Sequence, residues 1–424
     1  MQVHIGKPKG FSLTLRPTDL LTKRTHSLLR QDMTSNVVAL TSALTGKSCL
    51  VIGGAGSIGS ETLALLSGYP LSCLLVVDQD ENGLARLMRR LRGAPETPAV
   101  SDIETLPMDY GSAAFQAGLK QRGPFDFVLN FAALKHVRSE KQPLSIFNMM
   151  DTNILKQARL LETLNTLSPD YRYFSVSTDK AANPVSFMGA TKRVMEHVMF
   201  LTARTVSHIP NVSSARFANV AYSQGSLLES FITRLENDTP LAAPLGIERF
   251  FFTLQEAGEF CLLSGVLGEP DTIYVPSLSP EEHLVSMEDA AIGFLRANGY
   301  EPRHYPLEQQ ASAFKDLPDL KKQGLWPVIL TPANTAGEKP YEEFVGETET
   351  ASTGKFSALL DVAYDASLSK EKLAAFLGQL QTFSLSPDAL CELTMDELKD
   401  WISDLEPSFQ SSHIAASAKL DDRI

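Results

Sequence analysis

A glycine-rich turn between an apolar strand and a helix constrains the fold of this chain more than any other feature. Residues 51–59 read Val-Ile-Gly-Gly-Ala-Gly-Ser-Ile-Gly, after an apolar run and before a helical pattern over residues 60–67. In this context the glycines let the backbone approach a pyrophosphate, whose charge lies at the helix N-terminus. We therefore expect a dinucleotide to contact Gly53, Gly56, Ser57, Ile58 and Gly59.

Strand and helix patterns alternate regularly after residue 46. Strands are expected over residues 49–52, 72–78, 125–131, 172–177 and 213–220, and helices over residues 60–67, 81–91, 145–166 and 188–206. Such βαβ units, joined by right-handed crossovers, build a parallel sheet with helices on both faces. The predicted fold class is therefore α/β, a doubly wound parallel sheet (Rossmann fold) with a smaller C-terminal substrate-binding lobe.

Four segments follow from this pattern. We expect a basic N-terminal extension over 1–46, an NAD(P)-binding Rossmann domain over 47–221, a substrate-binding lobe partly interleaved with it over 222–346, and a C-terminal helical extension and tail over 347–424. The extension carries six lysines and arginines against two aspartates, a net charge of +4. It either touches an anionic surface or a neighbouring acidic subunit, or forms a solvated leader. Ser369 is placed to cap a helix over 370–380, and another helix is expected over 395–405.

Composition narrows the class of protein. The formal net charge of −12 argues against a nucleic-acid partner. No apolar run reaches the roughly 20 residues of a membrane span, and the N-terminus shows no signal-peptide pattern. The four cysteines lack paired spacing, which favours buried thiols over disulfides or a metal site. We therefore expect a cytoplasmic protein without a metal.

Acidic residues after the strand expected over residues 72–78, and after the apolar stretch that follows it, are the next candidates for contacts with the cofactor. Asp78 ends the second strand, close to the distance of about 20 residues at which a carboxylate bonds the adenosine ribose. Asp80 adds negative charge, and no basic residue follows before Arg86, so NAD is expected, with NADP possible. Asp109 is a candidate partner of the adenine amino group, or an ordinary loop aspartate.

The strands expected over residues 125–131 and 172–177 end in small and reactive residues. Ala132 and Ala133 leave room for the cofactor ribose and diphosphate. The strand over residues 172–177 runs into Ser177-Thr178-Asp179-Lys180, and Lys192 lies on the next helix. Because ligands bind at the carboxyl ends of the strands in such sheets, we expect an acid, an amine and a hydroxyl beside the cofactor.

These residues resemble those of the extended short-chain dehydrogenase/reductase superfamily and, within it, of the bacterial polysaccharide-biosynthesis (CapD-like) UDP-N-acetylglucosamine 4,6-dehydratases. The resemblance covers roughly residues 47–346. Its most specific part pairs Thr178-Asp179-Lys180 with Met188-Gly-Ala-Thr-Lys192, because most relatives have tyrosine where Met188 stands and only a subgroup has methionine. Further blocks lie at residues 53–61, 132–137, 183–184, 216–220, 225–226, 249–253 and 337–343.

The resemblance implies a nucleotide-sugar 4,6-dehydratase of surface polysaccharide or glycan biosynthesis, acting on an NDP-hexose such as UDP-N-acetylglucosamine. Hydride leaves C4 of the sugar for NAD(P), the C5 proton is removed, the C6 hydroxyl departs as water, and hydride returns to C6. Asp179 is then the acid at O6, Lys180 the base at C5, Thr178 a partner of the C4 hydroxyl, and Lys192 the group that holds the nicotinamide ribose. The substrate contacts implied or suggested by position are Lys135, His136, Asn219 and Arg249.

Physical chemistry sets a condition on these roles. Lys180 serves as a base only if its pKa falls well below about 10.4. Burial at the strand end and the nearby Lys192 are the two expected causes of such a lowered pKa. His136 either contacts the substrate or is an ordinary histidine at the start of a helix.

Three departures from the family pattern leave questions open. Met188 has no proton-accepting group, so Lys192, a water or Lys135 is the C4 base. Gln224 stands where an arginine is usual, and Thr335-Ala336 where Arg-Pro is usual, which puts the diphosphate contacts in doubt. The competing functions are an NDP-sugar epimerase acting through the same 4-keto intermediate and a catalytically reduced NAD-binding regulatory protein. We expect a homo-oligomer, because relatives self-associate through helices that flank the sheet.

Overall fold

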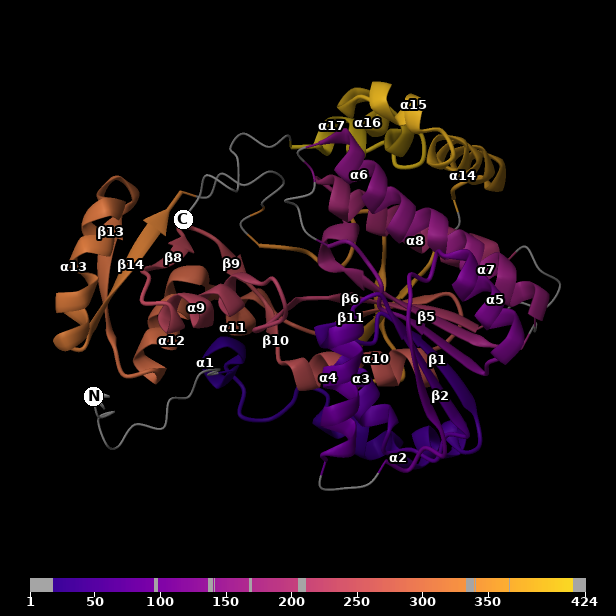
Figure 1. Ribbon diagram of the computed structural model, residues 1–424, viewed down its shortest axis with the longest axis horizontal. Coiled ribbons are helices and arrows are strands. Elements are labelled where there is room, and N and C mark those ends of the chain that lie inside the picture. The colour runs from indigo at the N-terminus through magenta and orange to yellow at the C-terminus, as the bar shows by residue number, and fades with distance from the viewer. Residues whose placement is uncertain are drawn as a thin grey trace, which may run out of the picture.

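A large, mostly parallel sheet forms the body of the protein (Figure 1). The computed structural model describes residues 18–94, 98–135, 140, 142–167, 170–204, 211–332, 339, 341–365 and 367–414. From β3 to β11 the neighbouring strands of this sheet are parallel, whereas β16 and β15 are antiparallel. In sheet order the strands are β15 (Ala351–Thr353), β16 (Leu359–Ala363), β11 (Thr272–Pro276), β6 (Asn211–Phe217), β5 (Arg172–Thr178), β4 (Phe127–Asn130), β1 (Ser48–Ile52), β2 (Cys73–Asp78) and β3 (Ile103–Pro107).

Helices cover both faces of this sheet, which confirms the predicted doubly wound α/β class (Figure 1). On one face α10 (Leu254–Leu267) packs on α3 (Ser57–Leu66) and α2 (Arg30–Leu44). On the other, α8 (Phe187–Ala203) lies beside α7 (Lys156–Leu167) and over β5 and β6. The remaining helices of the body are α4 (Glu81–Arg92), α5 (Ala113–Arg122) and α6 (Pro143–Met150).

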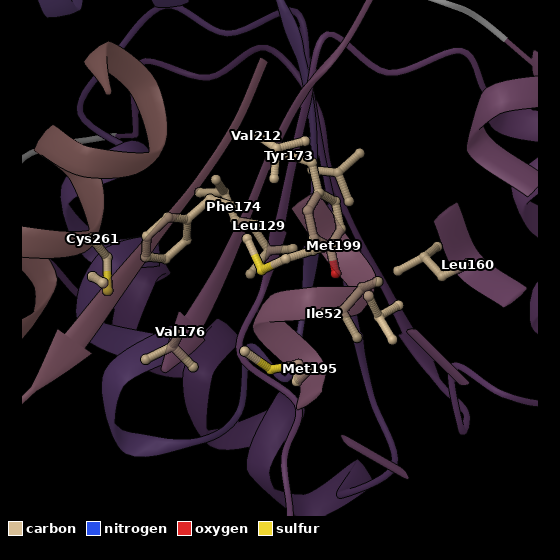
Figure 2. Packing of buried hydrophobic residues seen from close by; sticks show 14 of the residues in the cluster. Ile52, Leu129, Leu160, Tyr173, Phe174, Val176, Met195, Met199, Val212 and Cys261 are labelled. Atoms are coloured by element: carbon tan, nitrogen blue, oxygen red, sulfur yellow. The ribbon is translucent and has the colours of Figure 1, made fainter. Parts of the chain in front are cut away.

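The burial of the central strands explains why they could be recognised from the sequence. β1 and β4 are buried along almost their whole length, because helices cover both faces of a parallel sheet. Figure 2 shows Leu129, Phe174 and Val176 of the sheet packed with Met195 and Met199 of α8. Strands of this kind read as continuous apolar runs, which the sequence displays.

A smaller lobe follows β6. It contains a parallel three-stranded sheet in the order β13-β14-β8, with its own apolar cluster of buried residues. β7 pairs with β10 and β9 with β12 in the connection to the body. The elements are β7 (Asn219–Val220), α9 (Leu227–Glu236), β8 (Leu241–Pro244), β9 (Glu248–Arg249), β10 (Phe251–Phe252), α11 (Pro280–His283), β12 (Val285–Ser286), α12 (Met287–Ala297), β13 (Glu301–Pro306), α13 (Gln310–Lys322) and β14 (Leu325–Thr331).

The described part of the N-terminal extension packs on the protein itself. Helix α1 (Thr18–Thr22) lies against α12 of the smaller lobe, and α2 lies against α10 of the body. Between them, Arg24 forms an ion pair with the buried Glu256 at 2.9 Å. This segment is therefore a strap across both lobes and not a solvated leader; residues 1–17 lie outside the described part.

Residues beyond 346 contribute to the sheet as well as to helices. β15 and β16 extend the main sheet, although residues 347–424 were expected to be helical. Ser369 caps α14 as predicted, since its Oγ accepts a hydrogen bond from the Lys372 amide at 3.1 Å. The C-terminal helices lie over α6 and α8 (Figure 1). They are α14 (Lys370–Ser384), α15 (Pro387–Glu392), α16 (Met395–Ser403) and α17 (Phe409–Ser412).

A buried ionic cluster fixes α8 against the end of β5. The Arg216 guanidinium donates to both oxygens of Glu196 at 2.9 and 2.8 Å and of Glu349 at 2.5 and 2.8 Å. Ser177 Oγ donates to Glu196 Oε1 at 2.6 Å. Bidentate pairing satisfies charges that would otherwise be costly to bury. The residues that follow Ser177 are thereby held in one position relative to α8.

Candidate active site

The glycine turn after β1 forms a close-packed cradle. Gly53 has a φ of +76°, and a Cβ there would lie 2.6 Å from the Ala132 amide nitrogen. A Cβ on Gly59 would clash with the Gly53 carbonyl oxygen. Helix α3 begins at Ser57 directly after the turn, so its first amides face the space above it. The turn therefore has the shape and polarity that an anionic diphosphate requires.

We expect Gly53→Ala to lose dinucleotide binding and to lower the free energy of unfolding. Alanine at a left-handed φ costs about 1–2 kcal/mol, and here the added Cβ also displaces the loop after β4. Gly46→Ala is the matched control, because Gly46 has a similar φ of +70° and nothing within 4 Å of an added Cβ. NAD titration and denaturant unfolding of both variants check this; equal losses of stability, with binding retained in Gly53→Ala, would contradict it.

Asp78 is hydrogen-bonded to the glycine turn and to the residue that caps the next helix. Asp78 Oδ2 accepts from the Ala55 amide and Oδ1 from the Asp80 amide, each at 2.9 Å. A carboxylate has further lone pairs, so Asp78 can still accept from a ribose hydroxyl. The first basic residue after it, Arg86, pairs with Asp80 at 3.2 Å at the exposed surface.

Asp109 has a partner within the protein. Its Oδ2 accepts from Lys156 Nζ at 2.6 Å and its Oδ1 from the Gly111 amide at 2.8 Å. Burial opposes ionisation, but these hydrogen bonds outweigh it and lower the pKa of Asp109. Its proposed contact with adenine stays a prediction.

A cavity of about 510 Å³ joins the cradle to the ends of β4, β5 and β6. It collects most of the residues that the sequence singled out, namely Gly53, Gly56, Ser57, Ile58, Gly59, Ala133, Lys135, Thr178, Asp179, Lys180, Lys192 and Asn219. A neighbouring cavity of about 270 Å³, toward the smaller lobe, is lined by Lys180, Asn219 and Arg249 among others. Asp78, Asp109 and Ala132 do not line either cavity, and His136 lies outside the described residues.

The strand β5 ends in a short 3₁₀ turn that presents Asp179 and Lys180. Thr178 Oγ1 donates to Asp179 Oδ1 at 2.7 Å, and Lys180 Nζ lies 3.1 Å from the same oxygen. Asp179 is only 4% exposed, whereas the side chain of Lys180 is 24% exposed. An acid and an amine thus meet at one point of the cavity wall.

The pKa of Lys180 is shifted in the opposite direction from the one expected. Burial lowers its pKa, but Asp179 and Glu342 outweigh burial and the nearby Arg249, so the pKa of Lys180 is raised. Glu342 Oε1 lies 3.6 Å from Lys180 Nζ. The expectation of a pKa lowered by burial and Lys192 is therefore wrong for Lys180, because two carboxylates flank the ammonium.

The pKa of Lys192 is shifted in the direction that a role as a base requires. It is 3% exposed, and burial lowers the pKa of Lys192 to about 7, with Glu196 opposing the shift. Its Nζ lies 2.5 Å from the Val176 carbonyl oxygen and 2.9 Å from Met195 Sδ. Met188, one helical turn earlier, lines the same cavity. An amine with a pKa near 7 can accept a proton at neutral pH.

Residues 49–363 match the protein family described as polysaccharide biosynthesis protein. The chain belongs to this family. It is 27% identical to the probable polysaccharide biosynthesis protein EpsC of Bacillus subtilis over 76% of this chain and 48% of EpsC. It is 26% identical to an inverting UDP-N-acetylglucosamine 4,6-dehydratase of Campylobacter jejuni over 55% of this chain and 67% of that enzyme. The chain therefore spans about half the length of EpsC.

The fold is also similar to solved structures. The X-ray structure of Pen from Bacillus thuringiensis superimposes with a TM-score of 0.61 at 19% identity, over 80% of this chain and 98% of Pen. At this identity the similarity shows the fold alone, a sheet covered by helices on both faces.

Two hydrogen-bonded contacts beside the cavity could not be recognised from the sequence. Asn153, in a π-helical turn over Asp151–Leu155, donates to the Leu134 carbonyl oxygen at 3.0 Å and to Thr191 Oγ1 at 3.2 Å. It thereby ties the loop after β4 to α8; π-turns of this kind are frequent at functional sites. The backbone N–H of Gln224 donates to Ser57 Oγ at 2.9 Å. This hydrogen bond joins the start of the smaller lobe to the glycine turn.

Three further observations concern metal ligands, cysteines and apolar helices. Within the described ranges no cluster of three or more metal-ligating side chains occurs. All four cysteines, which are among the described residues, are free thiols. No helix in the described part is both long and apolar enough to cross a membrane.

Proposed function

We propose that this protein is a nucleotide-sugar 4,6-dehydratase that acts on an NDP-hexose, with UDP-N-acetylglucosamine as the first candidate, in polysaccharide biosynthesis. One observation carries the proposal: the glycine turn, Thr178-Asp179-Lys180 and Lys192 line a single cavity. That arrangement supports a reaction in which proton-transfer groups act beside a bound dinucleotide. The similarity to the Campylobacter enzyme supports the same reaction class.

The cavity fits a nicotinamide dinucleotide. Gly53, Gly56 and the start of α3 would hold the diphosphate, and Asp78 the adenosine ribose. Asp78 and Asp80 disfavour the extra phosphate of NADP, and Arg86 is already paired with Asp80, so we propose NAD. When bound, NAD supplies reversible hydride transfer, from C4 of the sugar and back to C6.

The chain's own residues then move the protons. Lys192, with its pKa near 7, takes the proton of the C4 hydroxyl while Thr178 bonds that oxygen. The C4 ketone acidifies the C5 proton, which Lys180 removes once its ammonium has lost its own proton. Asp179, which takes the proton that the Lys180 ammonium gives up across their 3.1 Å contact, protonates the departing C6 hydroxyl. Each of these transfers is general acid–base catalysis by a positioned side chain.

Basic side chains and one side-chain amide line the two neighbouring cavities between the glycine turn and the smaller lobe. Arg249 and Asn219 line the second cavity and would contact the nucleotide end of the substrate. Lys135 lines the first cavity, and burial lowers its pKa while Glu229 opposes the shift. We assign Lys135 to the substrate diphosphate, where Gln224 supplies no charge.

A panel of UDP-, GDP-, CDP- and dTDP-sugars, analysed by product mass, tests the proposal. Loss of one water from a sugar nucleotide is the expected result. An unchanged mass with altered chromatographic mobility would identify an epimerase instead. Tight NAD binding without turnover of any sugar would identify a regulatory protein.

We further propose that the enzyme works in the cytoplasm as a homo-oligomer. Free thiols are typical of a reducing compartment. The chain's own helices α14–α17 already cover α6 and α8 on one flank of the sheet, so subunits would meet elsewhere. Size-exclusion chromatography with light scattering measures the number of subunits.

A further inference from the structure

Glu342 is a buried carboxylate at the active site that no step above uses. It is 4% exposed, and its Oε1 makes no hydrogen bond with any group in the described part of the chain. That oxygen points at one cation, Lys180 Nζ, at 3.6 Å. An ionised oxygen buried without a hydrogen bond is costly, so its position calls for a reason beyond packing.

The chain positions Glu342 through its return from the smaller lobe to the main sheet. Lys339 Nζ donates to the Asn183 carbonyl oxygen at 3.1 Å, and Asn183 Nδ2 donates to Glu343 Oε2 at 2.8 Å. Arg216 Nη1 donates to the Phe344 carbonyl oxygen at 3.0 Å. These contacts on both sides of Glu342 hold the segment against the turn that carries Lys180.

We propose that Glu342 is a positioning residue for Lys180: together with Asp179 it holds the ammonium at the cavity wall and sets the pH at which Lys180 becomes an uncharged base. The proposal rests on the proposed function for the use of that base. Glu342 lines neither cavity, so it acts through Lys180 and not on the sugar.

The charges around the pair support this role. Lys180 faces Asp179 on its own turn, Glu342 on the returning segment and Arg249 on β9; Glu342 also faces Lys339. Burial and Asp179 raise the pKa of Glu342, while Lys180, Arg249 and Lys339 oppose this shift. The Glu342 carboxylate lies 3.6 Å from Lys180 Nζ and favours its ammonium form. Removing the Glu342 charge therefore makes Lys180 easier to deprotonate.

Glu342→Gln tests the proposal because it keeps the shape and removes the charge. We expect the pH midpoint of Lys180 deprotonation to fall by about 1 unit, the lower end of the effect of one opposite charge at this range. Trace acetylation of the protein across pH, with the Lys180 peptide quantified by mass spectrometry, measures that midpoint directly. The matched control is Glu343→Gln, since Glu343 is adjacent but half-exposed and pairs with Lys339 at 3.9 Å; its midpoint should equal that of the wild type.

The labelling needs no substrate, so it decides the role of Glu342 even if no sugar nucleotide is turned over. With an active enzyme, the rate of deuterium exchange at C5 relative to C4 oxidation should shift toward lower pH in Glu342→Gln. An unmoved Lys180 midpoint overturns the proposal. Should the glutamine variant fail to fold, Glu342→Asp withdraws the carboxylate by one methylene; a smaller downward shift supports the proposal, and no shift overturns it.

Discussion

Lys192→Arg should bind NAD normally and lose oxidation at C4 by about 10²- to 10⁴-fold, the range for removing a positioned general base. Burial lowers the pKa of Lys192 to about 7, so a large share of this amine is uncharged at neutral pH. An arginine keeps the positive charge and the reach toward the Val176 carbonyl oxygen, but it does not lose its proton. The rate at which the reduced nicotinamide absorbance appears in a single turnover measures this step.

The pH dependence of that step follows from the same ionisation. Lys192 accepts a proton only when uncharged, so C4 oxidation in the wild type should rise with pH through about 7 and then level off. In Lys192→Arg this rise should be absent. A wild-type rate that falls as pH increases through 7 would rule out an amine as the base.

Met188 allows a rescue experiment. It lines the cavity one helical turn before Lys192, so both side chains project from the same face of α8. Met188→Tyr would place a phenol there, and in the Lys192→Arg background it should restore part of the C4 oxidation. Lys135 is the competing base: if Lys135→Met abolished oxidation while Lys192→Arg retained it, Lys192 would be excluded.

The fold could be predicted where local pattern and burial agree. β1, β2, β4 and β5 are apolar runs between helical segments, and the structure has them within a few residues of the expected bounds. β15 and β16 could not be predicted to join the main sheet, because they join it through the pairing of β16 with β11, a strand far away in the sequence. The π-turn in the expected helix over 145–166 also depends on tertiary contacts, those of Asn153.

The site shows the same division between local and distant determinants. The glycine turn and Thr178-Asp179-Lys180 follow directly from strand ends, which parallel sheets bring to one edge. The lowered pKa of Lys192 depends on its burial against β5, where its Nζ lies 2.5 Å from the Val176 carbonyl oxygen. The raised pKa of Lys180 could not be predicted, because Glu342 reaches it from the segment after β14.

Lys180→Met should still permit oxidation at C4 but block every later step. Methionine keeps the aliphatic stem and removes the amine that we assign to the C5 proton, so loss of water should fall by about 10²- to 10⁴-fold. Reduced nicotinamide should then accumulate with the 4-keto sugar bound, and no solvent deuterium should enter C5. Asp179→Asn is the contrasting variant: C5 exchange should continue while departure of the C6 hydroxyl slows.

The protonation state of Lys180 makes this test sharper. Asp179 and Glu342 raise its pKa, so in the wild type deuterium exchange at C5 should increase with pH well above the range in which C4 oxidation levels off. Two lysines in one cavity would thus be separated by their pH dependence, as well as by mutation. Thermal unfolding must accompany the measurement, because Lys180→Met leaves two buried carboxylates without their shared cation. A folded Lys180→Met variant that exchanges C5 at the wild-type rate would remove Lys180 from the reaction and leave Asp179 as the nearest remaining group.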